Sequence, residues 1–86
     1  MAEIDQALNR IFEQHADEPD YEAEVCVTLT ASGAASALRE HGMSVTFESR
    51  HTRLVMGRLT ARVLERMAEL EGIERIESAA GEMRAL

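Results

Sequence analysis

The stretch from Thr52 to Ser78 constrains the fold more than any other, because two hydrophobic periods follow each other within it. Its first nine residues are predicted to form a strand, in which Val55, Gly57 and Leu59 fall on one face by a period of two and point inward. A helical period then begins after Thr60, a residue that can cap a helix, and ends at Gly72, where a left-handed terminator belongs. Ile73 starts a further strand. A strand, a helix and a strand in one sheet require a right-handed crossover and a parallel placement of the two strands.

Residues 21–49 read as a second copy of this plan. The stretch from Tyr21 to Thr30 alternates strictly, which predicts a strand with one buried side. The stretch from Ala31 to His41 is predicted to be a helix of small residues that ends at Gly42. The next strand is predicted to point three side chains inward, Met43, Val45 and Phe47. A short polar turn joins this strand to the one after it, so the two should pair antiparallel.

This order of elements predicts an α+β, ferredoxin-like βαββαβ sandwich over residues 21–78. We expect a four-stranded antiparallel sheet with both helices on one face. In residues 1–20 we expect an extra N-terminal helix over Ala2 to His15, followed by an acidic linker. That amphipathic helix either caps the domain's own core or docks a partner. Residues 79–86 are expected to form a C-terminal tail.

Length and charge exclude several classes of function. A chain of 86 residues has room for one domain and one core. The net charge is -7, with eight of the 16 acidic residues in residues 1–24, and all nine basic residues are arginine. The lack of lysine excludes a P-loop lysine and a Schiff base. An acidic chain with few aromatic residues repels phosphate backbones, so we expect no nucleic-acid partner.

The sequence has no basic start followed by an apolar run, so we expect a cytoplasmic protein with no membrane partner. Cys26 is the one cysteine, and an internal disulfide is therefore impossible. The groups that could carry catalysis, His15, His41, His51 and Cys26, fall on separate predicted elements and none has a partner at metal-ligand spacing. We therefore predict a non-catalytic domain without a metal or cofactor.

One face of the predicted sheet is neither fully polar nor core-like. Besides threonine and serine it carries apolar side chains, and its candidate binding residues are Cys26, Thr28, Leu54 and Met56. A mixed face of this kind often marks a docking surface.

From Gly42 onward, four features follow one another in a fixed order. They are Gly42 before a strand, the apolar-x-Gly-x-Leu strand Val55 to Leu59, a helix with Leu64 and Leu70, and the ending Gly72 to Glu77. This order resembles the subtilisin propeptide-like family of peptidase inhibitors, and the likeness covers residues 21–86. Members either assist the folding of their own protease or act as free-standing inhibitors. Because no protease domain follows Leu86 here, the free-standing mode is the one expected.

The resemblance implies that a subtilisin-like serine protease is the partner. In that family the open sheet face packs on surface helices of the enzyme, and the C-terminal tail lies substrate-like in the active-site cleft. By resemblance the tail here would occupy the non-primed subsites with Met83, Arg84, Ala85 and Leu86. Leu86 would enter the specificity pocket, and Met83 would enter the apolar pocket three residues upstream. A strand added to the enzyme's binding edge and held by sheet docking would inhibit as a bound product does.

A second interpretation is a homo-oligomeric, ACT-like regulatory or small-ligand-binding module with the same topology. Leu54, Met56 and the first helix would then pair with a second copy in a homodimer. In that case Ser32 and Gly33 would border a ligand site.

Overall fold

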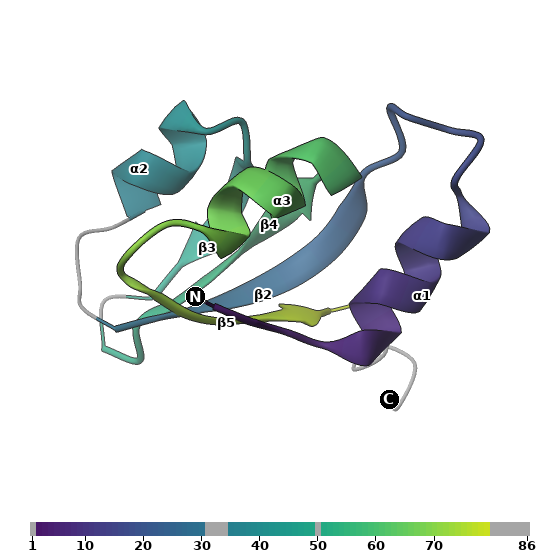
Figure 1. The fold of residues 1–86 in the computed structure, drawn as a ribbon. Helices are drawn as coiled ribbons and strands as arrows, with labels where there is room; N and C mark the ends of the chain where they lie inside the picture. Colours follow the sequence, from purple (N-terminus) through teal and green to yellow (C-terminus); the bar gives the residue numbers. More distant parts are fainter. Residues whose placement is uncertain (1, 31–34, 50, 80–86) are drawn as a thin grey trace.

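The computed structural model describes residues 2–30, 35–49 and 51–79, which form an α+β fold with three helices and a five-stranded mixed sheet (Figure 1). The elements in chain order are β1 (Glu3–Ile4), α1 (Gln6–Gln14), β2 (Ala23–Leu29), α2 (Ala35–Glu40), β3 (Ser44–Glu48), β4 (Leu54–Leu59), α3 (Ala61–Ala68) and β5 (Ile73–Ser78). The strand order across the sheet is β1-β5-β2-β4-β3.

The central strand is β2, which pairs antiparallel with both β4 and β5. β4 and β5 therefore run in the same direction, joined through α3, and this confirms the crossover expected from the sequence. β3 pairs antiparallel with β4 and forms one edge of the sheet.

The prediction of a four-stranded, wholly antiparallel sheet is wrong, because β1 adds a fifth strand that runs parallel to β5. The backbone N–H of Asp5 donates to the carbonyl of Ile76 at 3.0 Å, which holds the start of the chain extended. The first helix therefore begins at Gln6 and not at Ala2 as predicted. Ile4 fits the helical spacing of residues 2–15, yet it lies in strand β1 of the sheet.

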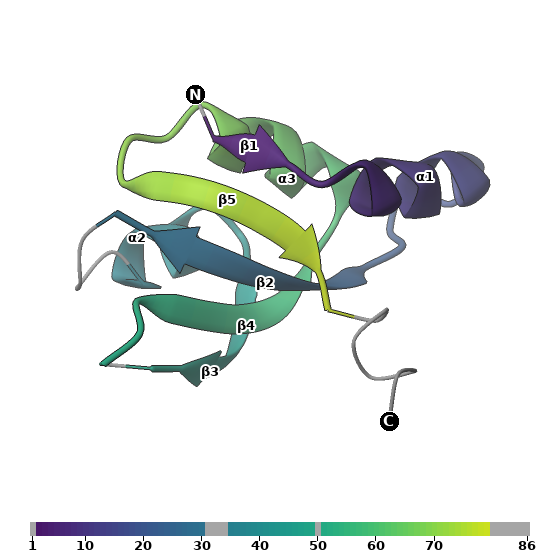
Figure 2. The same ribbon diagram turned by 90° about the horizontal axis from the view of Figure 1, so that it is seen from below.

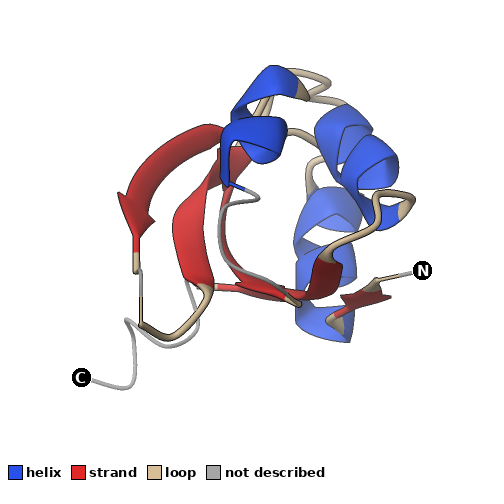
Figure 3. Cartoon of the chain, turned by 90° about the vertical axis from the view of Figure 1, so that its left-hand side faces the viewer, coloured by secondary structure: helices blue, strands red, loops and turns tan. Residues whose placement is uncertain are grey.

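All three helices lie on one side of the sheet (Figure 3). The core fills the space between them and the sheet, and its most deeply buried side chains are Leu8, Leu38, Leu59, Met67, Ile76, Val25, Val27 and Val55. Leu8 of α1 is fully buried in that cluster, so the first helix packs on the domain's own core. Burial of this leucine contributes about 2 kcal/mol to the packing of α1 on the core.

The helix ends follow the sequence closely. Thr60 accepts a hydrogen bond from the backbone N–H of Val63 at 3.3 Å and so caps the start of α3. Gly42 follows α2 with a φ of 107°, and Gly72 precedes β5 with a φ of 92°. Both glycines adopt the left-handed conformation that the sequence predicted for them.

Phe47 lies on the opposite face of the sheet from the one predicted. The register of β3 against β4 shifts between Val45 and Phe47, so that Val45 pairs with Gly57 and Phe47 pairs with the adjacent Met56. This β-bulge reverses the alternation, and Phe47 points away from the helices with 56% of its surface exposed. Glu48 then turns to the helix side, where its carboxylate lies 3.6 Å from Arg39 of α2.

Ser78 at the end of β5 has a buried hydroxyl oxygen with no hydrogen-bond partner among the described residues. It pairs with Val25 and therefore faces the helix side. An unsatisfied buried hydroxyl costs about 1–3 kcal/mol, so we expect Ser78→Ala to raise the free energy of unfolding by about 1 kcal/mol. Urea denaturation would measure this. Ser44→Ala on exposed β3 is the control, and destabilisation by Ser78→Ala would show that the hydroxyl is bonded.

Candidate functional site

The side of the sheet away from the helices forms the open face, and none of the three helices crosses it (Figure 2). The pairing registers place on this face Glu3, Glu24, Cys26, Thr28, Ser44, Phe47, Leu54, Met56, Arg58, Arg75 and Glu77. The four sheet residues proposed from the sequence, Cys26, Thr28, Leu54 and Met56, are all half-buried members of it. Phe47 was not predicted to lie on the open face, because the alternation of residues 43–48 does not reveal the bulge in β3.

The apolar half of the open face consists of Phe47, Leu54 and Met56 on β3 and β4, with Cys26 beside them on β2. Met56 pairs with Phe47 on one side and with Cys26 on the other, so these three side chains form one row across the sheet. Leu54 lies two residues from Met56 on the same face. Phe47 is the only exposed large apolar side chain among the described residues. A half-exposed phenylalanine within an apolar group is the usual centre of a protein-binding surface.

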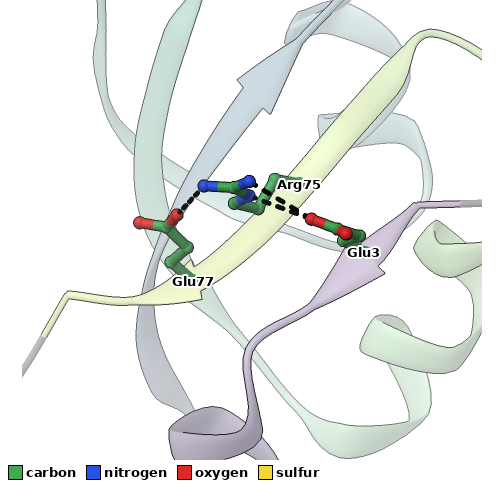
Figure 4. Close-up of polar contacts among 3 residues, drawn as sticks. All are labelled: Glu3, Arg75 and Glu77. Atoms are coloured by element: carbon green, nitrogen blue, oxygen red, sulfur yellow. Dashed lines mark hydrogen bonds and ion pairs between the residues drawn. The ribbon is translucent and has the colours of Figure 1, made fainter.

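The charged half of the open face lies on β1 and β5 (Figure 4). The Arg75 guanidinium contacts Glu3 at 3.2 Å and Glu77 at 3.1 Å, and so bridges the two carboxylates. A second ion pair joins β4 to β2, where Arg58 lies 3.4 Å from Glu24. These charges border the apolar half on two sides, as the polar rim of an interface borders its centre.

Hydrogen bonding to Glu77, and then the charge of Glu3, raises the pKa of the Arg75 guanidinium above its ordinary value. A raised pKa adds stability that is complete below the ordinary value and is lost only as the pH rises through the folded value. Both values lie far above neutral pH. Arg75 therefore remains charged at neutral pH and gives the open face no pH dependence there.

The remaining titratable candidates do not come together. The His15 ring stacks on Tyr21 with a centroid separation of 3.6 Å and contacts Glu18 at 3.0 Å, beyond the end of α1. His41 follows α2, and His51 lies in the turn before β4. Within the described ranges, no three His, Cys, Asp or Glu side chains are grouped so that they could hold a metal ion.

The tail residues Met83, Arg84, Ala85 and Leu86, and also Ser32 and Gly33, lie outside the described residues. The described chain ends at Ala79, which is 2% exposed and donates its backbone N–H to the carbonyl of Glu24 at 3.0 Å. The tail therefore starts from a fixed point beside the first residues of β2.

No protein-family model matches the chain, and neither a curated protein nor a solved structure matches it at a significant level. Among the described residues, no helix has both the length and the apolar character needed to cross a membrane.

Proposed function

We propose that this chain is a non-catalytic protein-interaction domain that inhibits a subtilisin-like serine protease through its open face and its tail. The observation that carries the proposal is the exposure of Phe47 next to Met56 and Leu54, on a sheet face that none of the three described helices covers (Figure 2). Apolar side chains gathered this way are costly to leave in water, and an uncovered sheet face can pack against the surface helices of an enzyme.

The strand order gives further support to the proposal. The strand order β5-β2-β4-β3, with α2 and α3 on one side, is the one that a ferredoxin-like βαββαβ domain requires, and β1 and α1 would be additions to such a domain. We propose that the fold is of this type. It is the fold that the resemblance to the subtilisin propeptide-like family implies.

The tail would supply the second contact of the proposal. Seven residues follow Ala79, and an extended chain of that length spans at most about 25 Å. Met83 and Leu86 would then enter the substrate pockets of the enzyme while the open face is docked. Two linked contacts bind more tightly than either alone, because the second forms at a high effective concentration.

Titration of a subtilisin-type protease with the full chain and with a chain that ends at Glu82 tests the proposal. We expect inhibition by the full chain at micromolar concentration or below, and inhibition about 100-fold weaker without residues 83–86. The shortened chain should still bind enzyme whose active site is blocked by a small covalent inhibitor. If the full chain does not inhibit at micromolar concentrations, the proposal is wrong.

The apolar half of the open face also suits a second copy of the chain, as in the ACT-like interpretation. It extends to β3, which is an edge strand, so two copies could meet there. The bulge in β3 opposes direct pairing of the two edges, because bulges interrupt the regular edge of a strand. Analytical ultracentrifugation separates the two candidates, since a tight dimer that protects Phe47 favours self-association and a monomer favours the inhibitor.

A further inference from the structure

A groove of about 600 Å³ lies between α1 and α3 on the helix side of the domain. Its apolar lining comes from three elements and includes Ile4 of β1, Phe12 of α1 and Leu64 of α3. Leu64 is buried and the other two side chains are half-buried. The groove lies where the N-terminal helix α1 runs beside α3 without packing tightly on it.

Three exposed carboxylates also line this groove: Glu13 on α1, Glu65 on α3, and Glu69 directly after the end of α3. The sequence places Arg62 and Arg66 on α3 near the two glutamates, yet none of the three glutamates forms an ion pair within the described part of the chain. The groove thus combines an apolar lining with three carboxylates that form no ion pair among the described residues. A ligand that complements it must be apolar and basic together.

The shape of α3 indicates what kind of ligand fits. Ala61 and Ala68 lie two turns apart on the groove side of α3, with Leu64 between them. Small residues at this spacing let another backbone approach closely, while Leu64 and Phe12 give it apolar contacts. The eight residues of α3 span about 12 Å, the length of two helical turns.

We propose that the groove binds an amphipathic helix of a partner protein, with arginine or lysine side chains on both sides of its apolar stripe. The apolar stripe lies between α1 and α3, and the basic side chains pair with Glu13, Glu65 and Glu69. This site lies on the opposite side of the sheet from Phe47, so both surfaces can be occupied at once. If the proposed protease also docks on the open face, the domain links two partners, one on each side of its sheet.

A synthetic peptide tests this site without a known partner. The probe is a two- to four-turn helix with leucines along one stripe and arginines beside them, added to the ¹⁵N-labelled full chain. We expect saturable binding with amide shift changes in α1 and α3, and none at β3 and β4. The same peptide with glutamate in place of each arginine should not bind.

The matched variants isolate the role of the groove carboxylates. Glu13→Gln, Glu65→Gln and Glu69→Gln combined should weaken binding about tenfold. Glu22→Gln, Glu40→Gln and Glu71→Gln combined change the net charge equally at exposed positions away from the groove, and should leave binding within about twofold. The proposal is overturned if the peptide does not bind, if both triple variants weaken binding equally, or if the shift changes fall on the open face.

Discussion

Replacing Gly57 with alanine is expected to lower the free energy of unfolding by about 3 kcal/mol. Gly57 is buried in β4, between Val25 of β2 and Val45 of β3. A β-carbon at this position would overlap the backbone carbonyl oxygen of Ser44 and would lie 2.9 Å from the terminal methyl of Met43. The methionine can move aside, but the carbonyl belongs to the neighbouring strand. Alanine therefore forces β3 away from β4.

This loss is a large part of the total, since a domain of 86 residues has about 4–13 kcal/mol in all. Gly72→Ala is the matched control, because a β-carbon there has no atom within 4 Å and only the φ of 92° opposes it. We expect that change to cost about 1 kcal/mol. Chemical denaturation measures the free energy of unfolding of both variants. An equal decrease in the two would show that β3 and β4 are not as close as described.

Phe47→Ala is expected to weaken inhibition of a subtilisin-type protease about 30-fold, if the open face is the docking surface. Phe47 is 56% exposed in the free chain and lies next to Met56, where a partner would bury it fully. Truncation of a central aromatic residue in an interface typically costs about 2 kcal/mol, and each 1.4 kcal/mol is tenfold in affinity. The inhibition constant measures the effect.

The neighbouring position supplies the control for this prediction. Glu48 follows Phe47 on β3 but points to the helix side, toward Arg39. Glu48→Ala should therefore leave the inhibition constant within about twofold. Phe47→Ala should change the free energy of unfolding by less than about 1 kcal/mol, because the ring is half exposed. Equal inhibition by the wild type and Phe47→Ala would exclude the apolar half of the open face as the contact.

Periodicity along the chain was sufficient for most of the fold. The buried positions Val25, Val27 and Val55 were all predicted from alternation alone. The cap at Thr60 and the left-handed Gly72 were predicted from local chemistry. Each of these features depends on residues close together in the sequence. The local pattern of apolar, capping and glycine residues is therefore enough to predict them.

The two errors concern features that depend on pairing between distant strands. Val45 and Phe47 keep the spacing of one face, but one extra residue on β3 relative to β4 turns Phe47 outward, and no local pattern marks it. For β1, a signal was present. Asp5 is a preferred residue for the position before a helix, and it separates Ile4 from α1. Phe47, the exposed large apolar residue of the open face, was assigned to the core.

Methyl NMR on a chain labelled at methionine tests directly whether a protease docks on the open face, because two methionines in the core serve as internal controls. Met56 lies on the open face, whereas Met43 and Met67 are 4% and 0% exposed in the core. On addition of an inactivated subtilisin-type protease, irradiation of the enzyme should reduce the Met56 methyl signal strongly and leave those of Met43 and Met67 nearly unchanged. A complex in which the Met56 signal is no more reduced than the two core signals would contradict docking through the open face.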